Sequence, residues 1–182
     1  INIPSFKTEE SDIAKFLASN FNRWGYEVDL QEVDPGRYQT IATLKGTGGG
    51  NTLMLNGHID MDPLSMGWKR DPWIPSVEGD NLYGAGVYNM KGGVTAIVAA
   101  AEALRRSKAQ LKGDLVVACV VGELQGGVGT EYLLKKGYRP DMAIVAEPND
   151  QDSVLTVHAG WLEMAVNVIG KSSHISQQEY GI

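Results

Sequence analysis

The chain has 182 residues, and its 16 lysines and arginines against 22 aspartates and glutamates give a formal net charge of −6 at pH 7. This acidic balance argues against nucleic acid and anionic membranes as partners. The single cysteine excludes an internal disulfide framework and predicts a reducing compartment, the cytoplasm. No run approaches the roughly 20 apolar residues of a membrane-spanning helix, so we expect no membrane segment.

The first part of the chain predicts a helix followed by a hairpin. Apolar residues recur at helical spacing over residues 8–24, and Gly25 stands where a C-cap glycine belongs. Residues 26–33 alternate like a strand, and residues 38–44 return as a second strand after a turn at Asp34-Pro35-Gly36.

Two glycine-rich stretches are not nucleotide-binding motifs. Residues 46–50 lack the Gly-Lys-Ser/Thr of a phosphate loop and lead into a strand, so a flexible hairpin is the preferred interpretation. Gly84-Ala85-Gly86 has Asn89 where a dinucleotide fingerprint needs its third glycine.

The middle of the chain alternates strands and helices. We expect buried strands at residues 52–55, 115–121 and 142–146, and helices at residues 92–106 and 129–136. This alternation predicts an α/β fold with a mostly parallel sheet flanked by helices.

The sequence pattern changes after Pro148, which predicts a second unit. Residues 154–157 and 161–169 look like strands of a smaller α+β unit. We therefore expect a first domain at residues 1–152 and the beginning of a second at residues 153–182, in a chain that is incomplete at its C-terminus.

Polar side chains follow three of the predicted strands. His58 and Asp60 follow the first, Glu123 the second and Glu147 the third. Because open α/β sheets bind ligands at the carboxyl ends of their strands, we expect these side chains to share one edge of the sheet. Taken singly, each is more often an ordinary loop residue; the coincidence of three strands favours a site.

The residue types suit a metal centre with a catalytic base. His58 and Asp60 are two apart, so one segment supplies an imidazole ligand and the carboxylate that orients it. Glu147 is a candidate second ligand, and Glu123 a candidate base for activating a metal-bound water.

These residues stand within a series of short motifs in fixed order. The motifs are Leu55-Asn56-Gly57-His58-Ile59-Asp60-Met61-Asp62-Pro63, Trp68, Asp71-Pro72-Trp73, Leu82-Tyr83-Gly84-Ala85-Gly86, Met90-Lys91-Gly92-Gly93, Glu123 with Gly126-Gly127-Val128-Gly129-Thr130, and Ala146-Glu147-Pro148. The series resembles the aminoacylase, acetylornithine deacetylase, succinyl-diaminopimelate desuccinylase and carboxypeptidase G family of zinc metallohydrolases. The resemblance covers nearly the whole chain and implies a zinc-exopeptidase-like catalytic domain with a lid and dimerisation domain.

The resemblance implies a role for each residue. His58 and Glu147 match ligands of the first metal ion, and Asp60 matches the carboxylate that orients the histidine. Glu123 matches the general base. His174 matches a histidine that polarises the substrate carbonyl, often across a dimer interface. A further histidine ligand would lie downstream of this sequence.

Two positions depart from the family pattern. Asn89 stands where the family has a bridging aspartate, and a neutral amide bridges two zinc ions poorly. Leu124 stands where the family has a glutamate ligand of the second metal. The losses fall on one of the two metal sites, which predicts a single-metal enzyme with His58, Glu147 and Asn89 or water around the ion. A one-residue slip in this alignment would instead make Glu123 a ligand.

Our leading hypothesis is a cytoplasmic, homodimeric, metal-dependent amidohydrolase or deacylase that cleaves a C–N bond of a small amide or N-acyl compound. We expect one Zn²⁺ per chain, with Mn²⁺ or Co²⁺ as alternatives. The alternatives are a non-catalytic member that binds a small molecule or protein partner, and a two-metal enzyme with a rearranged ligand set.

Overall fold

The computed structural model describes residues 1–149, 152–157, 159–160, 164, 166, 169–171 and 173–181. It divides into two compact units, Ile1–Asn149 and Asp150–Ile182, each of which is described by itself. The elements in chain order are α1 (Ser11–Trp24), β1 (Glu27–Asp34), β2 (Arg37–Leu44), β3 (Leu53–His58), β4 (Ser76–Glu78), β5 (Asn81–Tyr83), η1 (Val87–Lys91), α2 (Gly92–Arg106), β6 (Leu115–Val120), η2 (Glu123–Gln125), α3 (Val128–Lys135), β7 (Met142–Val145) and η3 (Ile175–Tyr180).

The first unit is built on a five-stranded sheet with the order β1-β2-β6-β3-β7. The α/β class is confirmed, but the sheet is mixed rather than mostly parallel. The β1–β2 hairpin packs antiparallel against β6, whereas β3 pairs in parallel with both β6 and β7. The hairpin accounts for the difference, because antiparallel strands need only a short turn between them.

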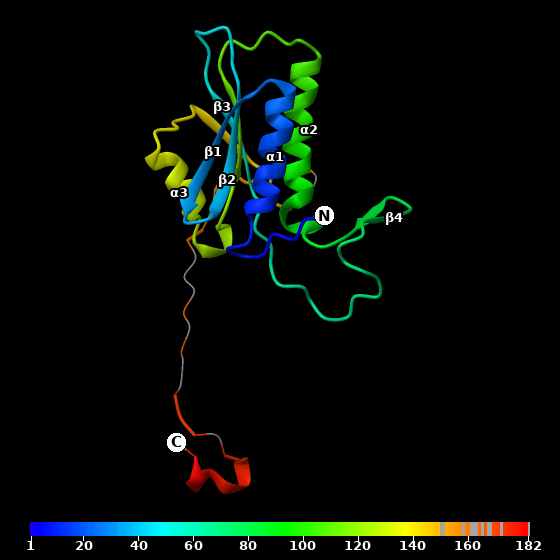
Figure 1. Cartoon of the computed structure of the whole chain (residues 1–182), viewed down its shortest axis with the longest axis vertical. Helices are drawn as coiled ribbons and strands as arrows, with labels where there is room; N and C mark the ends of the chain where they lie inside the picture. The colour runs from blue at the N-terminus through cyan, green and yellow to red at the C-terminus, as the bar shows by residue number, and fades with distance from the viewer. Residues whose placement is uncertain are drawn as a thin grey trace. The chain divides into compact units, whose positions relative to one another are not determined.

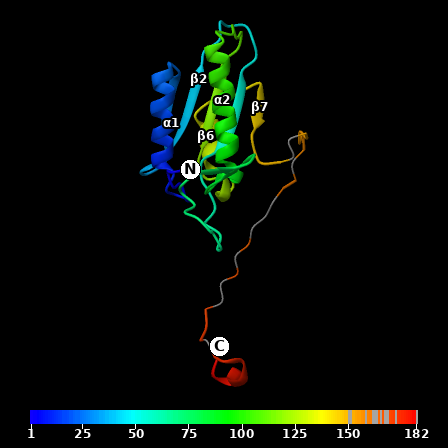
Figure 2. The same ribbon diagram turned by 90° about the vertical axis from the view of Figure 1, so that its right-hand side faces the viewer.

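Helices cover both faces of this sheet. In Figures 1 and 2, α1 and α2 lie side by side on one face, and α3 lies on the other. The main core fills the space between the sheet and the α1–α2 layer, where Phe21, Ile97 and Val117 are buried. A smaller core between the sheet and α3 contains Ile41, Val116 and Leu133. The three central strands are thereby fixed between two apolar layers, which holds their carboxyl ends in place.

The ends of α1 follow local chemistry. Gly25 has φ +87° and donates its N–H to the Asn22 carbonyl at 3.0 Å, as predicted for a C-cap glycine. The helix starts at Ser11 and not at residue 8. The preceding residue, Glu10, is fully buried and forms an ion pair with Arg37 at the start of β2.

An irregular helical turn, η1, leads into α2. Its backbone leaves helical geometry at Asn89, with φ −119° and ψ 105°, and the Asn89–Met90 peptide bond is cis. Regular helix begins at Gly92 and ends at Arg106, as the sequence predicts. Asn89 is therefore presented from a bend, and not from the face of a regular helix.

The second unit differs from the expectation of strands. Residues 154–157 are exposed and form no strand, because a strand needs a hydrogen-bonded neighbour that the described part of this unit does not supply. The predicted strand at residues 161–169 falls largely outside the described residues. Across the described ranges, the structure contains no helix long and apolar enough to cross a membrane.

Candidate metal centre

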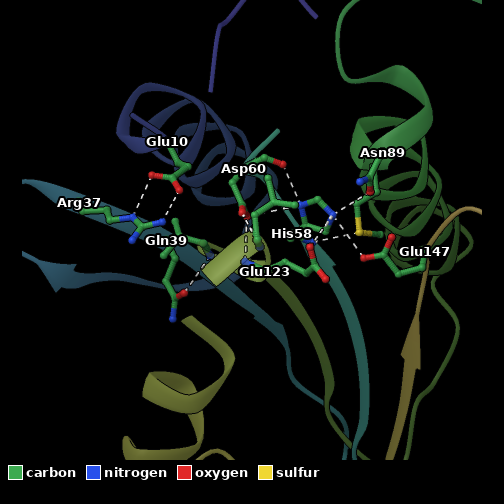
Figure 3. A network of polar contacts seen from close by, with 11 residues as sticks. Glu10, Arg37, Gln39, His58, Asp60, Asn89, Glu123 and Glu147 are labelled. Atoms are coloured by element: carbon green, nitrogen blue, oxygen red, sulfur yellow. Dashed lines mark hydrogen bonds and ion pairs between the residues drawn. The ribbon is translucent and has the colours of Figure 1, made fainter. Parts of the chain in front are cut away.

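Five of the six predicted site residues lie together at one edge of the sheet (Figure 3). His58 is the last residue of β3, Glu123 opens η2 just after β6, and Glu147 follows β7 by two residues. Because β3 runs parallel to both β6 and β7, their carboxyl ends meet at the same edge. Asn89 reaches the same place from the bend in η1.

The imidazole Nε2 of His58 faces three oxygen donors. It lies 2.9 Å from Asn89 Oδ1, 3.3 Å from Glu147 Oε1 and 4.0 Å from Glu123 Oε2. His58 is almost fully buried, whereas the side chains of Glu123 and Glu147 are 43% and 40% exposed. The imidazole therefore forms the inner wall of the site, and the two carboxylates border its opening to solvent.

The other ring nitrogen of His58 is held by Asp60. Nδ1 lies 2.8 Å from the Asp60 carbonyl oxygen and 3.4 Å from its Oδ1. The Asp60 carboxylate also accepts the backbone N–H groups of Glu123 at 3.3 Å and Leu124 at 3.1 Å. A carboxylate on the second nitrogen of a histidine fixes the tautomer and orientation of the ring, as at metal-bound histidines.

These charges shift the protonation of the site. Burial alone lowers the pKa of His58, but the hydrogen bond and charge of Asp60 and the charge of Glu147 outweigh burial and raise this pKa to about 9. Burial would raise the pKa of Asp60, but the hydrogen bond with His58 and the charge of His58 lower it overall. Burial and the charges of Glu123 and Asp60 raise the pKa of Glu147 despite the opposing charge of His58. Without a cation, the proton on His58 balances this cluster of acids.

The donor set suits one divalent cation. Ligands 2.0–2.1 Å from a tetrahedral zinc ion lie about 3.3 Å apart, which matches the separation of His58 Nε2 and Glu147 Oε1. In the described part of the chain, no group of three or more His, Cys, Asp or Glu side chains forms a ready metal site. The oxygen nearest to Nε2 belongs to Asn89, a neutral amide, which would be a weaker ligand than a carboxylate.

Leu124 places no donor atom in the site. Its backbone N–H donates to Asp60 and its side chain is an alkyl group, whereas Glu123 directs a carboxylate oxygen toward His58. A second ion would therefore depend on Asn89 and on ligands outside these residues.

His174, the sixth predicted residue, belongs to the second unit. It is exposed, and its Nδ1 lies 2.9 Å from the Ser176 hydroxyl. Its predicted role in polarising the substrate carbonyl stays a prediction.

A buried polar network behind the site was not predicted from the sequence. Arg37 and Glu10 form an ion pair with both side chains almost fully buried, and Gln39 is also fully buried (Figure 3). A pattern of apolar residues does not reveal such groups, because charged and amide side chains are mostly exposed. A signal that could have found them is the two-residue period of a strand, which places Arg37, Gln39 and Ile41 on one face of β2.

The chain is similar in sequence to known proteins. The family model for peptidase family M20/M25/M40 matches residues 54–178. The chain is 35% identical to N-formyl-4-amino-5-aminomethyl-2-methylpyrimidine deformylase of Bacillus subtilis, over 88% of this chain and 39% of that protein. It is 32% identical to acetylornithine deacetylase of Proteus mirabilis, over 100% of this chain and 47% of that protein.

A solved structure shows the same fold. The M20 family metallo-carboxypeptidase Sso-CP2 of Sulfolobus solfataricus superposes with a TM-score of 0.68 at 23% identity, over 80% of this chain and 35% of that chain. The chain spans less than half the length of these relatives. The family is metal-dependent. From the family match and the identities above, the chain belongs to peptidase family M20/M25/M40.

Proposed function

We propose that this chain carries the metal centre and general base of a hydrolase that cleaves the C–N bond of a small N-acyl compound. The observation that carries the proposal is the convergence of His58, Glu147 and Glu123 from three neighbouring strands. The imidazole and the Glu147 carboxylate lie at the spacing of two ligands of one ion, and the Glu123 carboxylate stands beside them.

The chemistry divides among the side chains. His58 Nε2 and Glu147 Oε1 would hold the cation, which when bound lowers the pKa of water and polarises a carbonyl. Asp60 keeps His58 oriented through Nδ1. Glu123 takes a proton from the attacking water at its carboxylate and delivers it to the leaving nitrogen as the C–N bond breaks. Both carboxylates at the opening are accessible to substrate, since each is about two-fifths exposed.

We propose zinc as the ion, at one per chain. One nitrogen and one carboxylate oxygen at tetrahedral spacing suit Zn²⁺, while Mn²⁺ and Co²⁺ accept the same ligand types. Leu124 and the neutral Asn89 supply no carboxylate for a second ion.

We propose an N-formyl or N-acetyl amine as the substrate class. The two relatives described above are named for removing a formyl group and an acetyl group. For the whole protein, a homodimer and a cytoplasmic location remain predictions. His174 also remains a predicted carbonyl-polarising residue, which we expect to lower kcat when it is replaced by alanine.

The Glu123→Gln variant tests the proposal, together with metal analysis. Glutamine keeps the size of the side chain but cannot accept the proton, so turnover of N-formyl and N-acetyl amines should fall by about 10²–10⁴-fold. The bound ion should remain, at about one per chain, since His58 and Glu147 are unchanged. Glu131→Gln is the matched control, because Glu131 is an exposed glutamate on α3 that pairs with Lys135.

Two other outcomes of the metal and turnover measurements would favour the alternative functions. A folded chain that binds no metal and turns over no amide would favour a non-catalytic member that binds a small molecule or protein. About two ions per chain would show that the assignment of Leu124 to a lost ligand position is wrong.

A further inference from the structure

The turn that carries Glu123 is rich in glycine. It connects β6 to α3, and three of its glycines, Gly122, Gly126 and Gly127, have φ between +71° and +79°. Glycine has the largest backbone freedom to lose on ordering, so such a turn has a weak preference for any one conformation. A base that must meet a water beside His58 needs this turn in one conformation, and contacts from β2 add to those that the turn makes with itself and with Asp60.

Gln39 on β2 holds the two ends of this turn. Its Oε1 accepts the N–H of Val121 at 3.3 Å, and its Nε2 donates to the carbonyl of Gly129 at 3.0 Å. Gly129 in turn donates its N–H to the Val121 carbonyl at 3.0 Å. The side-chain amide and the two backbone residues therefore close a ring of three hydrogen bonds at the base of the turn.

This ring needs a glycine at its far end. A Cβ on Gly129 would stand 2.3 Å from Gln39 Oε1 and 2.4 Å from the Val121 carbonyl oxygen. Gly129 is thus explained by the approach of the amide, and not by an unusual φ.

Gln39 is itself immobilised. It is fully buried, and its Nε2 also donates to Oε1 of Gln31, its directly paired neighbour on β1, at 2.8 Å. The β2–β6 ladder ends at the pair Thr40–Cys119, so the Gln39 side chain pairs with the N–H of Val121 where backbone pairing stops. Buried amides with every partner satisfied fix a single local structure.

We propose that Gln39 is a positioning residue for Glu123, which acts by tying together the two ends of the β6–α3 turn. The effect of Gln39 on turnover rests on the proposed function, whereas its effect on the conformation of the turn does not. Gln39 lies outside the metal site, so its loss should displace the base while leaving His58 and Glu147 in place.

The test compares Gln39→Met with Thr40→Val in the whole protein. Methionine keeps the length and removes the amide. Thr40 is the next residue of β2, is equally buried and donates its hydroxyl to the Ala14 carbonyl at 2.6 Å, so its replacement removes a buried hydrogen bond away from the turn. Hydrogen exchange is measured at the backbone amides of Val121 and Gly129. Zinc affinity is measured by titration, and turnover is measured with N-formyl and N-acetyl amines.

We expect Gln39→Met to speed exchange at Val121 and Gly129 by about tenfold or more, while amides inside β6 change as they do in Thr40→Val. In Gln39→Met, the zinc affinity should equal that of the original chain, and kcat should fall while KM is unchanged. Gln39→Leu also removes the amide at a similar size and adds no charge, so it should give the same pattern if Gln39→Met does not fold.

Equal exchange in the two variants at Val121 and Gly129, or wild-type exchange in Gln39→Met, would overturn the proposal. If the original chain binds no zinc and turns over nothing, the proposed function fails, yet the exchange comparison still decides whether Gln39 holds the turn.

Discussion

Asp60 joins the imidazole of His58 to the turn that carries Glu123. One oxygen of its carboxylate lies 3.4 Å from His58 Nδ1 and 3.3 Å from the backbone nitrogen of Glu123, and the other lies 3.1 Å from the nitrogen of Leu124. A single buried carboxylate thus contacts both the His58 imidazole and the turn that carries Glu123. A shift of Asp60 would move both.

Asp60→Asn should therefore weaken metal binding and catalysis together. The amide keeps the size but loses the charge that supports His58, and removal of such a partner typically costs 10–100-fold in metal affinity or activity. Zinc titration and turnover measure the two effects. Asp80→Asn, at an exposed aspartate between β4 and β5, is the control for loss of one negative charge. An unchanged zinc affinity in Asp60→Asn would contradict this role.

The pKa of His58 predicts a proton-linked metal affinity. This pKa is raised from 6.5 to about 9, so the metal-free imidazole is protonated at pH 7, with both ring nitrogens facing oxygen acceptors. A cation needs the neutral ring, so zinc binding at pH 7 should release about one proton, and affinity should rise about tenfold per pH unit up to about pH 9. Calorimetry in two buffers of different ionisation enthalpy counts the proton.

The same shift sets a stability trend for the metal-free chain. Because the folded-state pKa lies above the ordinary value, the stabilisation from the charged imidazole is complete below about pH 6.5 and is lost as pH rises through about 9. Urea unfolding in the presence of a chelator should show this decline.

For the calorimetry experiment above, zinc binding without proton release at pH 7 would mean that His58 is already neutral.

Asn89→Asp should strengthen the metal site. Asn89 Oδ1 lies 2.9 Å from His58 Nε2, so a carboxylate there adds an anionic oxygen next to the other ligands. We expect a zinc affinity higher by about tenfold or more, since carboxylates bind zinc far better than neutral amides do. Asn51→Asp adds the same charge before β3, at the opposite end of that strand, and should leave affinity unchanged. No gain in Asn89→Asp would show that this side chain does not reach the ion.

The meeting of His58, Glu123 and Glu147 could be predicted from sequence because it depends on a few local facts. Three apolar runs predicted strands, and a polar residue of the site followed each run within three residues. The carboxyl ends of parallel neighbours must then coincide, whatever the order of the strands. The antiparallel attachment of β1 and β2 did not alter this edge, so the mixed sheet left that expectation intact.

The supporting network could not be predicted in the same way. The two-residue period of β1 puts Leu30 on one face with Val28, but Leu30 is exposed, whereas Gln31 on the other face is buried against Gln39. A buried amide or charge needs a hydrogen-bonding partner, and that partner can be distant in sequence, as Glu10 is from Arg37. Periodicity reports the average character of a face and does not identify such partners.

Breaking the Glu10–Arg37 pair should be costly although it lies outside the metal site. Arg37 Nε donates to Glu10 Oε2 at 2.9 Å, and both side chains are almost fully buried. Arg37→Met would leave the Glu10 carboxylate buried without its partner, and the free energy of unfolding should fall by about 3–5 kcal/mol. Urea denaturation measures the loss. The double variant Glu10→Leu with Arg37→Met should recover most of it, because no unpaired charge remains buried.

An exposed ion pair supplies the matched control for this prediction. Lys45 and Asp114 lie 2.5 Å apart, but the lysine side chain is 55% exposed. Water already solvates its ammonium group, so Lys45→Met should change stability far less than Arg37→Met does. Similar losses in Arg37→Met and Lys45→Met would show that the Glu10 carboxylate finds water or a proton when its partner is removed, and that burial does not set the strength of this pair.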